Sequence, residues 1–153
     1  MAKNFGGVPH RAELVRVLDG VSYYNDSIGT SPTRTANGTL QLYDRKIILI
    51  AGGYDKQIPY DTLGPIIMDK VKTLILMGAT ADKIEAAVKA APNYCEQEIV
   101  ILHANSMEKA VALAKEQAQK GDIVSLSPAS ASFDLYPNFE ARGNHFKNIV
   151  NAL

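Results

Sequence analysis

Apolar and polar residues follow two different periods along this chain, and the two periods alternate. Four short runs that are almost entirely apolar have the length and composition of buried strands. They are Lys46–Ala51, Thr73–Met77, Ile99–His103 and Ile123–Leu126. Two further strands are expected ahead of them, at Glu13–Leu18 and Val21–Tyr24. The turn pair Asp19-Gly20 lies between these two strands and favours a hairpin.

Segments with helical spacing lie between the strands. Ser31 and Pro32 fit the N-cap and the first position of a helix that we expect to run to about Asp44. A capping box of Asn105 and Glu108 predicts the start of another helix. Three more are expected from apolar residues at helical spacing, from Gly64-Pro65 onward, around Ile84–Ala91 and over Phe139–Leu153. This alternation predicts a Rossmann-like α/β fold, with a mostly parallel six-stranded sheet and helices on both faces.

Composition and charge narrow the class of protein. The 153 residues are enough for one domain, and 46% hydrophobic with 21% charged residues is ordinary for a soluble globular protein. Sixteen basic residues balance sixteen acidic ones, so no electrostatic footprint indicates nucleic acid or an anionic membrane as a partner. No apolar run is long enough for membrane insertion, and no signal-peptide pattern is present. A single cysteine, Cys95, excludes an internal disulfide. We expect a soluble, cytoplasmic domain.

Three polar loops follow predicted strands, at residues 25–31, 52–56 and 127–132. In such a fold, ligands bind beyond the carboxyl ends of the parallel strands. The first loop carries the Thr30 hydroxyl, the second offers the Lys56 ammonium after two glycines, and the third is rich in serine. Turn formation alone explains each loop. Together, however, they favour a site for a small anionic or zwitterionic ligand.

Several familiar catalytic motifs are missing. The chain contains no G-x-S-x-G, no G-x-G-x-x-G and no P-loop sequence. No group of histidines and carboxylates has the spacing of metal ligands, so we expect no dedicated metal site. His103 ends a predicted core strand and is interpreted as a partly buried histidine with satisfied hydrogen bonds. His145 is interpreted as a surface residue.

Five segments, in this order and spacing, match one known family. They are Phe5–Arg11, Asn25–Ser27, Ile50–Lys56, Leu126–Asp134 and Asn138–Gly143. Over nearly its whole length the chain resembles the C-terminal domain of the Mur ligases. The Asp-Asn-Pro-Arg signature of the diaminopimelate- or lysine-adding enzyme is absent, which favours the D-glutamate-adding branch of the family. The resemblance implies an interdomain linker at residues 1–8 and the amino-acid-binding domain at residues 9–153.

The resemblance also implies a reaction. A complete ligase uses ATP and magnesium to phosphorylate the carboxylate of UDP-N-acetylmuramoyl-L-alanine, and the amine of D-glutamate then attacks the acyl phosphate. This step belongs to peptidoglycan precursor synthesis in the bacterial cytoplasm. The C-terminal domain closes over a central ATPase domain, which holds most of the ATP and magnesium contacts, and a further N-terminal domain binds the UDP substrate. Because those domains are not in this sequence, we expect the chain alone to be inactive.

Family motifs assign roles to residues of the amino-acid site. Thr30 and Lys56 are expected to bind one carboxylate of D-glutamate. Ser132, Phe133 and Phe139 are expected to bind the other carboxylate or to shape the site around it.

On the nucleotide side, His10, Arg11 and Asp26 are expected to face ATP in the closed state. Arg11 would contact phosphate and Asp26 the ribose. Many relatives carry a lysine where this chain has Ile28, so this site has one cation fewer. Position 130 is serine where cysteine is common. Two alternatives stay open, a stand-alone module that binds an amino acid or small anion without catalysis, and a regulatory domain that has lost the pocket.

Overall fold

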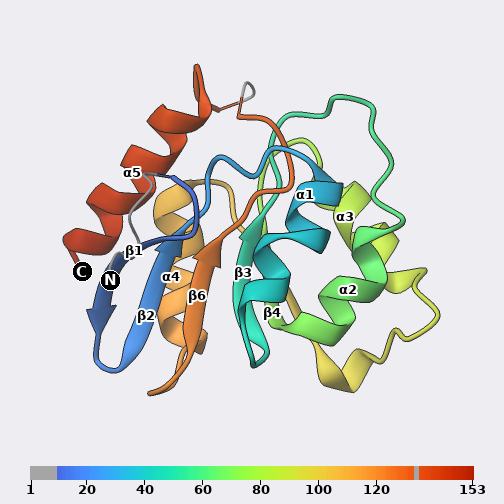
Figure 1. Ribbon diagram of the computed structural model, residues 1–153, viewed down its shortest axis with the longest axis horizontal. Coiled ribbons are helices and arrows are strands. Elements are labelled where there is room, and N and C mark those ends of the chain that lie inside the picture. Colours follow the sequence, from blue (N-terminus) through green and yellow to red (C-terminus); the bar gives the residue numbers. More distant parts are fainter. Residues whose placement is uncertain (1–9, 133–134) are drawn as a thin grey trace.

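A six-stranded sheet lies at the centre of the fold (Figure 1). The computed structural model describes residues 10–132 and 135–153, and the predicted linker at residues 1–8 lies outside them. The strands are β1 (Glu13–Leu18), β2 (Val21–Asn25), β3 (Ile47–Ala51), β4 (Val71–Leu76), β5 (Val100–His103) and β6 (Ile123–Leu126). Their order in the sheet is β1-β2-β6-β3-β4-β5, and only β1 pairs antiparallel to its neighbour. The predicted six-stranded, mostly parallel sheet is confirmed.

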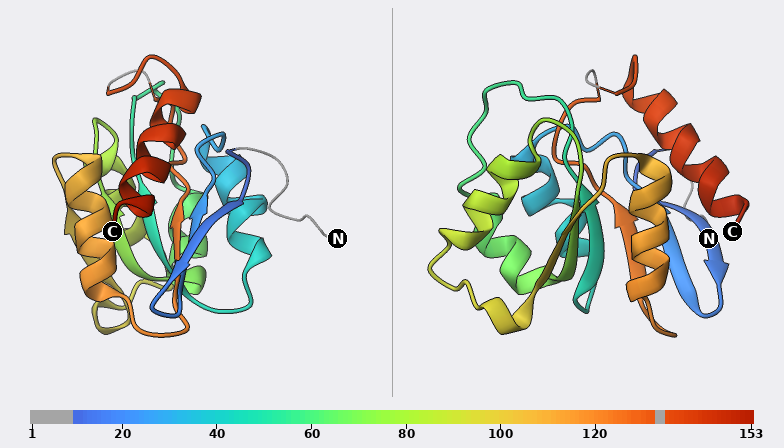
Figure 2. Two further views of the ribbon diagram at one scale, coloured as in Figure 1. Left: turned by 90° about the vertical axis from the view of Figure 1, so that its left-hand side faces the viewer. Right: turned by 180° about the vertical axis from the view of Figure 1, so that it is seen from behind.

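Helices cover both faces of the sheet (Figure 2). One face is covered by α1 (Pro32–Asn37), the 3-10 helix η1 (Thr39–Leu42), α2 (Leu63–Lys70) and α3 (Ala81–Lys89). The other face is covered by α4 (Met107–Gln117) and α5 (Phe139–Asn151). A second 3-10 helix, η2 (Glu96–Glu98), precedes β5. The described residues contain no helix that is both long and apolar enough to cross a membrane.

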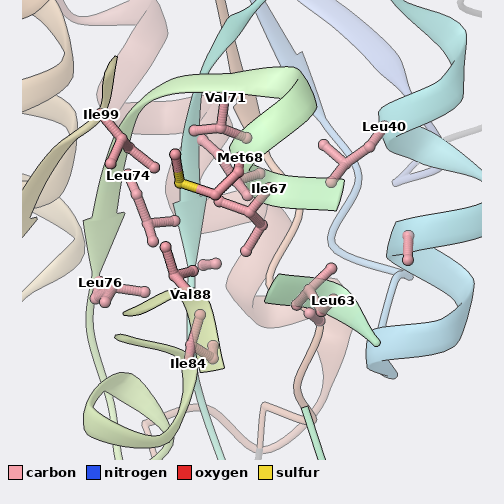
Figure 3. Close-up of a cluster of buried hydrophobic side chains, with 14 of the residues drawn as sticks. Leu40, Leu63, Ile67, Met68, Val71, Leu74, Leu76, Ile84, Val88 and Ile99 are labelled. Atoms are coloured by element: carbon pink, nitrogen blue, oxygen red, sulfur yellow. The ribbon is translucent and has the colours of Figure 1, made fainter. Parts of the chain in front are cut away.

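The central strand β3 contributes to the cores on both faces. Ile47, Leu49 and Ala51 pack into the core beneath α1, α2 and α3. Ile48 and Ile50 point the other way, into the core beneath α4 and α5. Each of the five is at most 1% exposed, which explains why the strand is a continuous apolar run instead of an alternating one. Figure 3 shows how side chains from α2, β4 and α3 fill the first core.

The hairpin between β1 and β2 forms as the sequence predicts. Asp19 and Gly20 have φ of 54° and 79°, so both central residues are in the left-handed region that tight hairpin turns require. Leu18 pairs with Val21 directly across this turn.

The first predicted helix is shorter than expected. Ser31 does cap it, since its side chain accepts a hydrogen bond from the Arg34 N–H at 3.3 Å. The α-helix ends at Asn37 instead of near Asp44, because Gly38 interrupts it and the chain continues as η1. Glycine is a poor helix former, and the η1 residue Thr39 also turns inward to donate a hydrogen bond to the Asp26 carboxylate.

Two other local predictions are wrong in detail. The N-cap of α4 is Ser106, whose hydroxyl accepts from the Lys109 N–H at 3.1 Å, and not Asn105. His103 is exposed instead of partly buried, because β5 is an edge strand. One ring nitrogen, Nε2, has a hydrogen-bonding partner, the Glu85 carboxylate at 2.7 Å.

Candidate functional site

The loops that follow β3 and β6 are joined by backbone hydrogen bonds at the upper rim of the sheet in Figure 1. The Gly52 N–H donates to the Pro128 carbonyl at 2.9 Å, and the Tyr54 N–H donates to the Ala131 carbonyl at 2.7 Å. A side chain at Gly53 would place its Cβ only 2.4 Å from the Ala131 oxygen. Glycine at this position therefore allows the two loops to approach so closely.

Buried hydroxyl groups fix the serine-rich loop from below. Ser130 is 1% exposed, and its Oγ lies 2.7 Å from the Tyr60 hydroxyl and 2.9 Å from the Thr80 hydroxyl. Thr80 in turn accepts a hydrogen bond from the Gly53 N–H at 2.9 Å. One network of four groups thus connects the serine-rich loop, residues 127–132, to the loop after β3 and to the start of α3.

A buried arginine connects the serine-rich loop to the loop after β2. Arg142 of α5 is 3% exposed and donates from Nη1 to the Ser130 carbonyl at 2.9 Å. The same guanidinium donates to the carbonyl of Ser27 at 2.8 Å and to its hydroxyl at 3.0 Å. The Ser27 hydroxyl then donates to the Phe139 carbonyl at 2.7 Å. The three loops and the start of α5 therefore form one connected unit.

A cavity of about 360 Å³ opens between these elements. Thr30, Lys56, Ser132 and Phe139, four of the five residues expected around D-glutamate, line it. The fifth, Phe133, lies outside the described residues. Ala131, Asn138 and Glu140 complete the lining. The structure thus brings these four residues to one cavity, as the sequence predicts. Their role in binding stays a prediction.

A smaller cavity of about 200 Å³ lies beside Asp26, at the start of the loop after β2. It is lined by Arg11, Asp26 and Arg34, together with Ala12 and three residues at the end of α1 and in η1. Asp26 is 3% exposed and accepts hydrogen bonds from the Ala12 N–H at 3.0 Å and from the Thr39 hydroxyl. Burial raises the pKa of Asp26, although these bonds and the two arginines act in the opposite direction. Two guanidinium groups beside a buried carboxylate suit a ligand that carries both phosphate and hydroxyl groups.

His10 lies within the chain's own packing and does not line this second cavity. It is 8% exposed, and its Nδ1 lies 3.0 Å from the Asn25 amide nitrogen. Its ring meets the Phe139 ring edge-on, with centroids 5.9 Å apart. Gly143 leaves room for it, because a Cβ there would lie 2.2 Å from the histidine Nδ1. His10 thus packs against Asn25 and Phe139, and a contact with nucleotide stays a prediction.

Sequence reasoning gave no role to Arg34, Asn138, Glu140 or Arg142. A usable signal existed for Arg142, which follows Phe139 by three residues and precedes Phe146 by four. It therefore falls on the apolar face of its helix. Asn138 and Glu140 lie in the segment Asn138–Gly143 that matches the family, but that match did not place them at a cavity. For Arg34 the sequence offered no signal, because only the fold brings it to the smaller cavity.

A third group of side chains comes together that the sequence did not suggest. Asp82, Glu85 and His103 bring ligand atoms within 4.8 Å of one another, although their spacing in the sequence did not suggest a cluster. The group lies at the edge of the sheet formed by β5, and none of its residues lines either cavity. The Lys89 ammonium already pairs with Glu85 at 2.9 Å. We assign no metal to it.

Comparison with known proteins places the chain in a family. The family described as "Mur ligase, glutamate ligase domain" matches residues 10–130. Proteins named UDP-N-acetylmuramoylalanine–D-glutamate ligase from Clostridium botulinum (strain Okra) and Clostridium acetobutylicum (strain ATCC 824) are each 57% identical over 155 residues. These alignments cover 100% of this chain but 33% of each relative, so the chain spans about a third of their length.

Solved structures agree on the fold. A murein peptide ligase from Psychrobacter arcticus superposes with a TM-score of 0.60 at 17% identity, over 97% of this chain and 31% of that one. Folylpolyglutamate synthase from Mycobacterium tuberculosis, complexed with ADP and AMPPCP, gives 0.55 at 14% identity, over 91% and 32%. The sheet order, the family match and the identity to the clostridial proteins lead to one conclusion: this chain belongs to the Mur ligase family, as its glutamate ligase domain.

Proposed function

We propose that this chain is the amino-acid-binding domain of an ATP-dependent ligase that adds D-glutamate to UDP-N-acetylmuramoyl-L-alanine in peptidoglycan precursor synthesis. The observation that carries the proposal is the cavity of about 360 Å³, where Thr30, Lys56, Ser132 and Phe139 meet from three separate parts of the chain. The printed name of the clostridial relatives supports D-glutamate as the amino acid. ATP and a UDP-linked substrate would place the reaction in the bacterial cytoplasm.

Within this cavity the two carboxylates of D-glutamate would take different partners. Lys56 offers an exposed ammonium, and Thr30 offers a half-buried hydroxyl beside it, so this pair would bind one carboxylate. Ser132, which is 3% exposed and also lines the cavity, would donate to the second carboxylate. Phe139 would fix the width of the cavity, and Phe133 keeps its proposed place beside Ser132.

The smaller cavity would face the nucleotide. Arg11, with Arg34 beside it, would contact phosphate, and Asp26 would accept hydrogen bonds from ribose hydroxyls. The Asp26 carboxylate already accepts two hydrogen bonds, so it suits a hydroxyl donor better than it suits magnesium. We therefore assign the magnesium ligands to the central domain of the complete ligase, which together with its N-terminal domain would be the main partner of this chain.

In the proposed reaction, the ATP γ-phosphoryl group is transferred to the substrate carboxylate, which releases ADP. The amine nitrogen of D-glutamate then bonds to the acyl carbon, the carbon–oxygen bond to phosphate breaks, and the amine loses a proton. This chain would contribute by binding and orienting the amino acid, and positioning of that kind accounts for a large part of catalysis in such transfers. Consistent with this division, the chain alone should form no ADP from ATP and both substrates.

Amide-resolved NMR of the chain tests both assignments. D-glutamate should shift the amides of Thr30, Lys56, Ser132 and Phe139 and leave those of Arg11 and Arg34 in place. ADP should do the reverse. Shifts by both ligands at the same cavity, or D-glutamate shifts confined to other surfaces, would contradict the proposal.

A further inference from the structure

Two opposite charges line the D-glutamate cavity. Lys56 and Glu140 are both exposed and both contribute to its wall. Among the described residues 10–132 and 135–153, no hydrogen bond or ion pair joins either side chain to another residue. As far as residues 10–132 and 135–153 are concerned, the charge on Glu140 is therefore available to a ligand.

A carboxylate in this position is unfavourable for a ligand that carries only negative charge. Lys56 attracts a dicarboxylate, but Glu140 repels it within the same cavity, and like charges at short range cost affinity. The repulsion becomes an attraction if the ligand also carries an ammonium group. An α-amino dicarboxylate satisfies both side chains at once, whereas a plain dicarboxylate satisfies only the lysine.

The position of Glu140 is fixed by its neighbours in the first turn of α5. Asn138 caps the helix and accepts from the Ala141 N–H at 2.8 Å. Arg142, one residue further on, is bonded to Ser27 and Ser130 of two cavity-forming loops. The start of the helix is thus tied to the same loops that form the cavity walls.

We propose that Glu140 binds the ammonium group of the amino acid and so selects an amino acid over a simple dicarboxylate; this rests on the proposed function. A glutamate in the first turn of a helix is also favourable for the helix itself. That purely structural role would alter stability but would not distinguish ligands with and without an amine.

The test compares D-glutamate with glutarate, the same dicarboxylate without the amine. Dissociation constants are measured by NMR titration for the chain, for Glu140→Gln and for Glu116→Gln. Glu116 is an exposed glutamate of α4 and serves as the control for the same loss of charge. We expect Glu140→Gln to weaken D-glutamate by roughly tenfold to a hundredfold, as for a lost charge-assisted hydrogen bond. Glutarate should bind to Glu140→Gln as tightly as to the unaltered chain, or more tightly. Glu116→Gln should leave the dissociation constants of both ligands unchanged.

The remaining outcomes separate this inference from the proposed function. If Glu140→Gln leaves D-glutamate binding intact, or weakens the binding of both ligands equally, Glu140 does not bind the ammonium group. The assignment of the cavity to D-glutamate is then unaffected. If D-glutamate shifts no amide around the cavity of the unaltered chain at any concentration, the D-glutamate site itself is wrong, and the inference falls with it.

Discussion

Arg142 donates hydrogen bonds to both oxygens of Ser27, to the carbonyl from Nη2 at 2.8 Å and to the hydroxyl from Nε at 3.0 Å. Its third nitrogen donates to the carbonyl of Ser130 at 2.9 Å. One buried side chain of the last helix therefore sets the distance between the loops after β2 and β6. The planar guanidinium suits this task, because its donors point in fixed and different directions.

Replacing Arg142 by lysine should loosen both loops. Lysine keeps the charge, but one ammonium cannot reach Ser27 and Ser130 together, so buried carbonyls lose donors. We expect the free energy of unfolding to fall by about 2 kcal/mol, measured by urea denaturation. D-glutamate binding should weaken as well. The control is Arg45→Lys, an exposed arginine that donates to the Gly121 carbonyl at 2.9 Å, which should cost less than about 0.5 kcal/mol. Equal costs for the two changes would contradict the positioning role.

The shared hydroxyl of Ser130 should show strong coupling with Tyr60. Ser130→Ala leaves the buried Tyr60 and Thr80 hydroxyls one partner short, and we expect a loss of about 1–3 kcal/mol in the free energy of unfolding. Ser130→Cys should cost less, because a thiol still donates and accepts weakly. In a double-mutant cycle with Tyr60→Phe, the double variant should lose about 1 kcal/mol less stability than the sum of the losses in the two single variants. Additive losses would mean that the hydrogen bond between Ser130 and Tyr60 does not contribute to stability.

A methyl group at position 53 should disturb the cavity directly. In Gly53→Ala the new Cβ would lie 2.4 Å from the Ala131 carbonyl oxygen, which forces the serine-rich loop away from the loop after β3. We expect a loss of about 1–3 kcal/mol in stability and weaker D-glutamate binding. Gly121→Ala provides the comparison, because φ there is +95° but the space around its Cβ is open. It should cost stability through backbone strain and leave ligand binding unchanged.

Glu13 should stabilise the folded chain at neutral pH, and this contribution should be lost at acidic pH. Partial burial tends to raise the pKa of Glu13, but hydrogen bonds from the His10 N–H at 3.1 Å and from Lys147 at 2.9 Å outweigh it and lower that pKa below its ordinary 4.5. A folded-state pKa below the unfolded value means stability that is present above about pH 4.5 and lost as the pH falls through the folded pKa.

The corresponding variant is Glu13→Gln. It should be less stable than the native chain by about 1 kcal/mol at pH 7. The difference should shrink steadily in denaturation curves below pH 4.5, because the native glutamate is then protonated too. Glu98→Gln, which removes an exposed pair with Lys46 at 3.8 Å, should show little effect at any pH. A difference that is constant with pH would show that packing, and not charge, is responsible.

The sequence predicted the strands well because burial dominates their composition. The apolar run of β3 is buried on both faces, so its pattern alone identifies the strand. The helix after Ser31 was harder to predict, because Gly38 and the bond from Thr39 to Asp26 decide where it ends. The second of these is a contact between residues from different elements, which local propensity does not contain.

The candidate site was predicted in part for a similar reason. Parallel strands end at one rim, so the loops of Thr30, Lys56 and Ser132 had to lie near one another once the topology was right. The topology does not say which charged residues complete the cavity. Glu140 reaches it because α5 begins there, and Arg142 is buried because three loop oxygens need donors at that point.

The most direct test of the central claim is the affinity of the chain for D-glutamate and for L-glutamate, measured by NMR titration with Lys56→Ala and Lys109→Ala. Lys109 is an exposed lysine of α4, so its loss controls for net charge. We predict that D-glutamate binds more tightly than L-glutamate, that Lys56→Ala weakens it by roughly tenfold or more, and that Lys109→Ala leaves it unchanged. Equal binding of the two isomers, or unchanged binding of D-glutamate to Lys56→Ala, would contradict the assignment of this cavity to D-glutamate.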